Sequence, residues 1–154
     1  SIMIEIQALV SSAVYGTPQR ISNGFNSKRL NMLLAILEKK AGFKIWVKDV
    51  FINITGGIKI EDTAIDLAVV AAILSSNINI AINNDTCFCA EVDLSGELRS
   101  VSNIDKRISE AERLGYKKII VSNNSKIGYT PKLIQTVKLK NLSQVVKEIF
   151  TEKD

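Results

Sequence analysis

The chain has 154 residues, with 20 basic and 16 acidic side chains, no histidine and a formal net charge of +4. Hydrophobic residues make up 46% of it, which is typical of a globular domain with a sizeable core and excludes a disordered chain. The absence of histidine excludes serine–histidine and cysteine–histidine catalysis and histidine-ligated zinc, and no apolar run approaches the length of a membrane span.

The first half of the chain is expected to form two strands, over residues 2–10 and 49–55, with a turn-rich segment and a helix between them. That helix starts at a cap on Asn26 or Ser27 and ends before Gly42. After a glycine pair at 56–57, a second helix runs to about residue 74 and is apolar on nearly every face, so we expect it to be buried at the centre of the domain. The spacing of Thr63 and Asp66 predicts a capping box at its start.

The second half is expected to contain strands at 86–92, 98–101, 118–121 and 136–139, with helices at 102–114 and 142–150. The spacing of Ser102 and Asp105 predicts another capping box. Cys87 and Cys89 alternate onto one face of their strand, where we expect them to pack in the core of a cytoplasmic protein. Together these elements predict a single α+β domain, that is, a mixed α/β fold.

Several uncommon phrases occur in a distinctive order: EIQALV, GTPQRISNGFNSKRLNMLLAILEKKAG, DVFINITGGIKIED, DLAV and AEVDLSGELRSVSNIDKRISEAERLGYKKIIV. From Glu5 to Phe150 they resemble the C-terminal domain of the RadA/Sms family of bacterial DNA repair and recombination proteins. That domain is in turn similar to the proteolytic domain of Lon proteases. The resemblance therefore implies one compact Lon-protease-like domain over residues 1–154.

Lon proteases use a serine–lysine dyad, and this chain departs from both positions. The resemblance places Ile65 at the serine position and Asp105 at the lysine position. An isoleucine has no nucleophilic group, and an aspartate is not the amine base that activates one. We therefore expect this chain not to be an enzyme. A dyad displaced to Thr63 and Lys106 is the alternative, although a shift of one residue turns a helical side chain by about 100°.

The resemblance also implies that basic residues of this domain hold DNA by its phosphate backbone, without sequence preference. Aromatic residues are only 6% of the chain, which argues against a platform for base stacking. Arg29 is the first candidate, because an arginine can grip phosphate oxygens in two places. For each residue the alternative is a solvated charge or a local salt bridge. The candidate DNA-binding residues are Arg20, Lys28, Arg29, Arg99, Lys106 and Arg107.

The parent of such a domain is expected to be a DNA-dependent ATPase that forms a hexameric ring and drives branch migration in homologous recombination. This chain has no G-x-x-x-x-G-K-[ST] phosphate loop, so we expect ATP, magnesium and zinc only in the rest of the parent, and no cofactor, metal or membrane contact here. A start at Ser1 without methionine or signal peptide suggests a fragment or a processed product. The competing functions are a divergent serine/threonine–lysine peptidase and an oligomerisation module that does not touch DNA.

Overall fold

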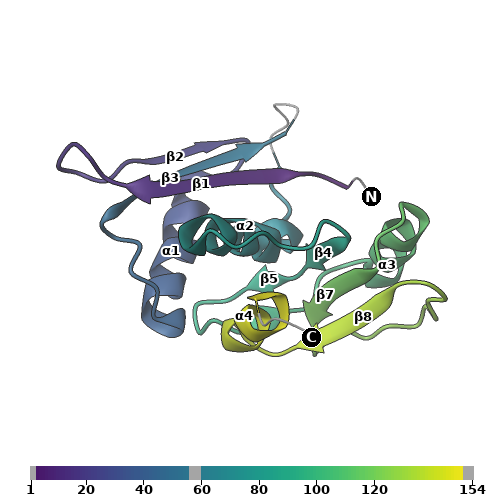
Figure 1. The fold of residues 1–154 in the computed structure, drawn as a ribbon. Coiled ribbons are helices and arrows are strands. Elements are labelled where there is room, and N and C mark those ends of the chain that lie inside the picture. The colour runs from purple at the N-terminus through teal and green to yellow at the C-terminus, as the bar shows by residue number, and fades with distance from the viewer. Residues whose placement is uncertain (1–2, 56–59, 151–154) are drawn as a thin grey trace.

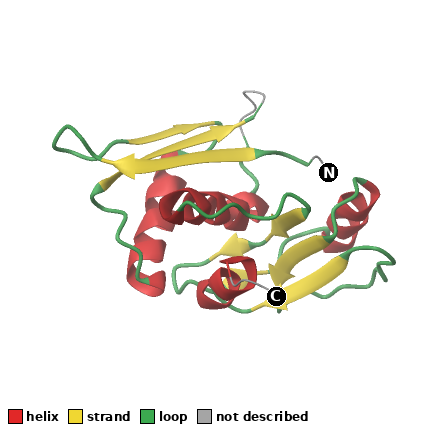
Figure 2. Ribbon diagram, in the orientation of Figure 1, coloured by secondary structure: helices red, strands yellow, loops and turns green. Residues whose placement is uncertain are grey.

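The computed structural model describes residues 3–55 and 60–150. Helices and strands form a small mixed α/β domain, which confirms the predicted fold class (Figures 1 and 2). No helix in these two ranges is both long and apolar enough to cross a membrane. The elements in chain order are β1 (Ile6–Ser12), β2 (Arg20–Asn23), α1 (Ser27–Ala41), β3 (Lys48–Ile54), the 3₁₀ turn η1 (Thr63–Ile65), α2 (Asp66–Ile78), β4 (Thr86–Cys89), β5 (Glu91–Val92), β6 (Leu98–Arg99), α3 (Ile104–Arg113), β7 (Lys118–Ser122), β8 (Gln135–Leu139) and α4 (Leu142–Phe150).

The first sheet has the order β1–β3–β2 and combines two kinds of pairing. β1 runs antiparallel to β3, with Ile6 opposite Ile54, whereas β2 runs parallel to β3. One face of this sheet lies over α1 and α2 (Figure 1). Alternate residues of β1 and β3 face these helices, because successive side chains of a strand point to opposite faces. Strand β2 falls in a segment for which the sequence predicts only turns, so that prediction is wrong over these residues.

Helix α1 confirms the sequence prediction at both ends. The Asn26 side chain is the N-cap and accepts a hydrogen bond from the amide of Arg29 at 2.9 Å. Gly42 ends the helix in the left-handed region, at φ 75°. The apolar stripe between these ends is buried in the larger of two core clusters. Its members are Leu30, Leu33, Leu34 and Leu37.

Helix α2 is central, as predicted, but its start is built differently. The turn η1 precedes it, and Asp62 caps that turn by accepting a hydrogen bond from the amide of Ala64 at 2.9 Å. The predicted capping box of Thr63 and Asp66 is wrong, because the Asp66 side chain turns inward and has no exposed surface. The glycine pair at 56–57 lies outside the described residues.

The second sheet is parallel, has the order β4–β7–β8, and lies on the other side of α2 from the first sheet (Figure 1). The strand predicted over 86–92 is divided at Ala90. The Ala90 amide donates to the carbonyl of Ala64 at 3.1 Å, and its carbonyl accepts from the amide of Leu67 at 3.2 Å. These two bonds attach the start of α2 to the strand, and the chain continues as the short antiparallel pair β5–β6.

The turn between β5 and β6 requires a glycine at its fourth position. Gly96 has φ 80°, and a Cβ atom there would lie 3.1 Å from the Cβ atom of Lys40. Other residues rarely adopt this backbone conformation, and a side chain would have to displace the end of α1. The turn therefore packs directly against α1.

The other face of the first sheet carries an apolar row. Leu9, Phe51 and Ile21 are register partners across the three strands. Leu9 and Ile21 are 57% and 45% exposed, and Trp46 at the entry to β3 is 53% exposed. None of the elements built from the described residues covers this face (Figure 1).

Candidate functional site

A buried carboxylate at the start of α2 organises the candidate site. Both oxygens of Asp66 are bound, and the residue has no solvent-exposed surface. Nε of Arg29 donates to Oδ1 at 2.6 Å, and Nη2 of Arg29 donates to Oδ2. The amide of Val92 donates to Oδ2 at 3.1 Å. One side chain thus joins α1, α2 and β5.

This pairing gives Arg29 a structural role. It is the local salt bridge that the sequence offers as the alternative to DNA binding. Burial raises the pKa of the Asp66 carboxyl, and the hydrogen bonds from Arg29 and Val92 oppose that rise. The hydrogen bond to Asp66 in turn raises the pKa of the Arg29 guanidinium. The Arg29 side chain keeps 26% of its surface exposed. DNA contact by Arg29 stays a prediction, and such a contact would use a guanidinium that is already bound on one side.

A second arginine joins α3 to η1. Nη2 of Arg107 donates to Oδ2 of Asp62 at 2.8 Å, and its Nε donates to the carbonyl of Ser102 at 2.8 Å. Burial favours a higher pKa for Asp62, but the amide of Ala64 and the Arg107 guanidinium outweigh it and lower that pKa. Like Arg29, Arg107 borders the start of α2 and neutralises an aspartate there.

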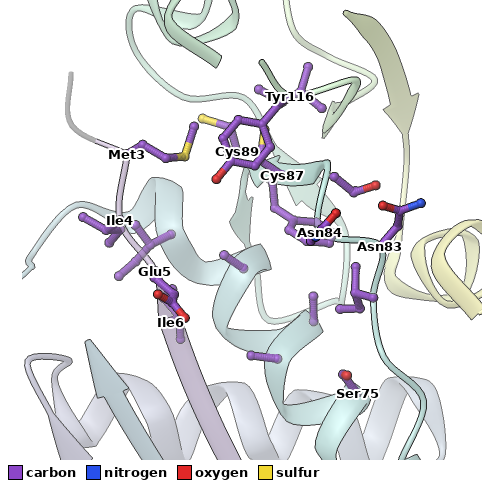
Figure 3. A pocket seen from close by; sticks show the side chains of 18 of the residues that line it. Met3, Ile4, Glu5, Ile6, Ser75, Asn83, Asn84, Cys87, Cys89 and Tyr116 are labelled. Carbon is purple, nitrogen blue, oxygen red and sulfur yellow. The ribbon is translucent and has the colours of Figure 1, made fainter. Parts of the chain in front are cut away.

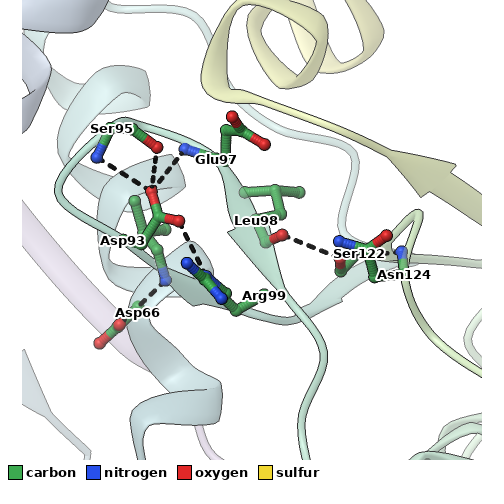
Figure 4. Close-up of polar contacts among 9 residues, drawn as sticks. Asp66, Asp93, Ser95, Glu97, Leu98, Arg99, Ser122 and Asn124 are labelled. Carbon is green, nitrogen blue, oxygen red and sulfur yellow. Dashed lines mark hydrogen bonds and ion pairs between the residues drawn. The ribbon is translucent and has the colours of Figure 1, made fainter.

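Arg99 belongs to the turn between β5 and β6 (Figure 4). Oδ1 of Asp93 accepts hydrogen bonds from the amides of Ser95 and Glu97 and from the Ser95 hydroxyl, and Oδ2 accepts one from Nε of Arg99 at 2.8 Å. Burial raises the pKa of Asp93, but these hydrogen bonds outweigh burial and lower that pKa to about 2. The Arg99 side chain is 63% exposed, so it is far more accessible than the two arginines described above.

Two further candidate cations are open to solvent beside these pairs. Lys28 precedes Arg29 in the first turn of α1, and Lys106 precedes Arg107 in the first turn of α3. Both lysines are exposed, and neither has an ion-pair partner within residues 3–55 and 60–150. With Arg99, they are exposed cations of the described residues that flank the ion pairs at Asp66, Asp62 and Asp93.

The sixth candidate, Arg20, lies on the first sheet in β2. Its Nη2 atom donates to the carbonyl of Ile45 at 3.1 Å. Its Nε atom is buried and has no hydrogen-bond partner among the described residues. Arg20 therefore fastens the entry to β3, and the structure does not group it with the cations around α2.

The two positions that the resemblance assigns to a protease dyad lie on different elements. Ile65 ends η1 and packs, partly buried, against the apolar core. Asp105 is exposed in α3, where Oδ1 accepts hydrogen bonds from the amides of Gly128 and Tyr129 at 2.9 and 3.1 Å. The predicted capping box of Ser102 and Asp105 is therefore wrong, since Asp105 holds a distant loop.

The alternative dyad is also not joined. No hydrogen bond links Thr63 to Lys106 in the part of the chain that the structure describes. It is Arg107, one residue later, that reaches back to η1. A helical shift of one residue accounts for this, because it turns the lysine away from the face that Arg107 occupies.

A groove of about 810 Å³ runs along α2 between β1 and β4 (Figure 3). Its floor is the small-residue face of α2, and its walls are residues 3–8 on one side and 81–89 on the other. Sequence reasoning missed this groove. The available signal was the row of alanines at helical spacing that lines the floor, namely Ala64, Ala68 and Ala72.

Cys87 and Cys89 lie on one wall of the groove, and their burial confirms the predicted core packing. Burial raises the pKa of Cys87 to about 12 and that of Cys89 to about 11, so both thiols stay protonated at neutral pH and react poorly. Among the described residues, no group of three or more histidine, cysteine, aspartate or glutamate side chains is placed to hold a metal ion.

A family model described as subunit ChlI of Mg-chelatase matches residues 5–125, which span the elements from β1 to β7. Curated relatives carry the name DNA repair protein RadA. The protein of Streptococcus pneumoniae is 40% identical over 150 residues, which are 97% of this chain and 36% of the relative. The protein of Helicobacter pylori strain 26695 is 49% identical over 121 residues, which are 79% of this chain and 27% of the relative. That of Bacillus subtilis is 38% identical over 147 residues, or 95% and 32%. The chain thus spans about a third of the length of the curated relatives it matches.

Proposed function

The chain belongs to the family described as subunit ChlI of Mg-chelatase and is a homologue of proteins named DNA repair protein RadA, and from this premise we propose that it serves DNA repair as a non-catalytic domain. In this proposal the domain keeps a Lon-protease-like fold, presents a basic surface to DNA and helps to assemble copies of its parent protein. The observation that carries the proposal is the set of cations around the start of α2, in a chain whose relatives are named for DNA repair.

The exposed cations are the proposed phosphate contacts. Lys28 and Lys106 have no acidic partner among the described residues, and Arg99 is largely exposed. Arg29 and Arg107 use part of their guanidinium groups to hold Asp66 and Asp62. We propose that these two arginines position the surface and add to its charge. Contacts of this kind are strongly dependent on salt and carry little sequence preference.

Fluorescence anisotropy of labelled DNA across a salt series tests this surface. The variant Lys28→Ala/Arg99→Ala/Lys106→Ala is expected to bind more weakly, and the slope of log K against log salt should fall by about 0.9 for each phosphate that the variant no longer neutralises. The matched control removes three exposed lysines of the C-terminal region: Lys126→Ala/Lys138→Ala/Lys147→Ala. Equal binding by the two variants, or no binding by the wild type at low salt, would leave the domain without a DNA role.

The open face of the first sheet supports the assembly part of the proposal. An apolar row such as Leu9, Phe51 and Ile21, of which Leu9 and Ile21 are exposed, is typical of a surface that contacts another protein. We propose that the parent forms a hexameric ring in the cytoplasm and drives branch migration with ATP, and that ATP, magnesium and zinc bind outside this chain. Light scattering of the parent with Leu9→Asp should show a smaller particle than the wild type, and an unchanged mass would exclude this face.

A displaced peptidase is the weaker candidate, because Thr63 and Lys106 share no hydrogen bond in the described structure. Cleavage of an unfolded protein that disappears in Thr63→Ala and in Lys106→Ala would favour it. A domain that assembles but fails the DNA assay would instead be the pure oligomerisation module.

A further inference from the structure

The groove along α2 is bordered by two edge strands, β1 on one side and β4 on the other. In β1 the odd-numbered residues bond to β3, since the amide of Thr55, just beyond β3, donates to the carbonyl of Glu5. An antiparallel pair bonds through alternate residues, so the even-numbered residues of β1 direct their backbone groups away from β3. The amide of Val10 follows this direction and donates to the hydroxyl of Ser76 on α2 at 2.9 Å.

The groups farther along the edge are unpaired. Ile6 and Ala8 direct their N–H and C=O groups away from β3, and none of these groups has a hydrogen-bond partner among the described residues. The opposite wall contains one similar position, Phe88 in β4. Ala90 bonds to η1 rather than to β7, so Phe88, two residues earlier on the same strand, also directs its backbone groups toward α2. An edge of this kind is a template for another strand.

We propose that the groove binds an extended polypeptide segment that carries a lysine or arginine, and that it holds the segment as an added strand against β1. Backbone donors and acceptors that alternate along a strand match only the backbone of another extended chain. The floor suits this occupant, because the small side chains of Ala68 and Ala72 on α2 leave room above the helix for an extended chain. In Figure 3, Ile4 and Ile6 stand on one side of the gap, and Asn83 and Asn84 stand on the other.

The charges of the groove favour a basic polypeptide over nucleic acid. Of the described lining residues, Glu5 and Glu110 are acidic, and Arg107 is the single cation. Arg107 is already neutralised by Asp62. Glu110 shares its charge with the exposed Arg113, so we assign Glu5, an exposed residue at the rim of the groove, as the main anchor of the basic side chain. A carboxylate at the rim of the groove repels phosphate, so we assign the groove to a polypeptide and not to DNA, although Arg107 borders both the groove and the proposed DNA surface.

Titration of the isotope-labelled 154-residue chain with defined peptides, followed by two-dimensional NMR, tests the inference. The probe is the capped octapeptide KVTVTVTK. We expect saturable shifts of the amides of Ile6, Ala8 and Phe88. The same peptide methylated on alternate backbone nitrogens, and the peptide EVTVTVTE, should each bind about tenfold more weakly, because one lacks donors and the other repels Glu5.

A variant of the floor provides an independent test. Ala72→Leu fills the groove and is expected to abolish the shifts, whereas Ala35→Leu adds the same side chain on the exposed face of α1 and should leave them unchanged. The proposal is overturned by the absence of shifts at millimolar KVTVTVTK, by equal affinity for the methylated peptide, or by a DNA duplex that shifts the same amides. Because the peptide comparison uses the wild type, it decides the matter even if Ala72→Leu does not fold.

Discussion

Replacing Arg29 with alanine should destabilise the domain strongly, because it leaves the Asp66 carboxylate buried without its charged partner. Asp66 has no exposed surface, and Arg29 donates to both of its oxygens. Removing one partner of a buried ion pair costs about 3–5 kcal/mol. Val92 still donates one hydrogen bond and the site borders solvent, so we expect the lower end, about 3 kcal/mol. In a domain of this length that corresponds to a fall in Tm of about 6–12 °C.

The loss of stability in Arg29→Ala depends on pH, and the direction of this dependence follows from the burial of Asp66. The unperturbed carboxyl has a pKa of 3.8, burial raises the pKa in the folded chain, and Arg29→Ala removes the main group that opposes the rise. Between 3.8 and the raised pKa, the folded variant keeps a proton that the unfolded chain has released. The variant therefore gains stability as the pH falls through this window. Its deficit relative to the wild type is greatest at neutral pH and shrinks in acid.

Urea unfolding followed by far-UV circular dichroism, at neutral pH and at mildly acidic pH, measures this deficit. Arg99→Ala is the control, because its exposed pair with Asp93 should contribute less than about 1 kcal/mol. Arg29→Met/Asp66→Leu removes both charges and should recover much of the loss. A cost of Arg29→Ala below about 1 kcal/mol, or one that is the same at both pH values, would refute the reasoning.

Three further predictions concern the loop, the turn and the thiols. Glu112→Gln should loosen the loop over 129–134, because a tyrosine hydroxyl and three loop amides donate hydrogen bonds to this carboxylate and lower its pKa to about 2. The stability that the carboxylate gives to the loop is present above the usual pKa of 4.5 and is lost as the pH falls toward 2. Amide hydrogen exchange of the loop will detect both changes. Gly96→Ala should lower the free energy of unfolding by more than the roughly 1–2 kcal/mol that a left-handed backbone conformation costs a residue with a side chain. Gly42→Ala, with open space around it, should cost that backbone strain alone. Equal losses for the two variants in urea unfolding would contradict the close packing at Gly96. Cys87 and Cys89 should resist a thiol reagent at pH 8 until the chain is denatured, and rapid modification of the native protein would contradict their burial.

Helix α1 shows which parts of the fold the sequence determines locally. The cap on Asn26, the leucine stripe and the end at Gly42 all depend on residues within a few turns of one another. Strand β2 is the opposite case. Its four residues have no distinctive pattern, and they become a strand because β3 supplies a parallel partner. Pairing of this kind depends on residues far apart in the sequence, and periodicity does not reveal it.

The capping role predicted for Asp66 is the clearest case in which reasoning from neighbouring residues was wrong. Its spacing from Thr63 offers a capping role, but its true partner Arg29 lies 37 residues earlier. The sequence did contain a signal, since a lone acid within a helix that is apolar on nearly every face requires a buried partner. The groove was hidden for a related reason. Its walls come from two sheets, and only their arrangement around α2 shows that the edges of β1 and β4 are left unpaired.

The junction of Arg29, Asp66 and Val92 also bears on folding kinetics. Its bonds span 37 and 26 residues, so it closes only after the chain has collapsed around α2. A carboxylate that loses its water before its partner arrives is destabilising, and we therefore place the junction after the rate-limiting step, among positions of low φ-value. Its disruption should accelerate unfolding far more than it slows folding. The junction thus determines how long the native domain persists, rather than how quickly it forms.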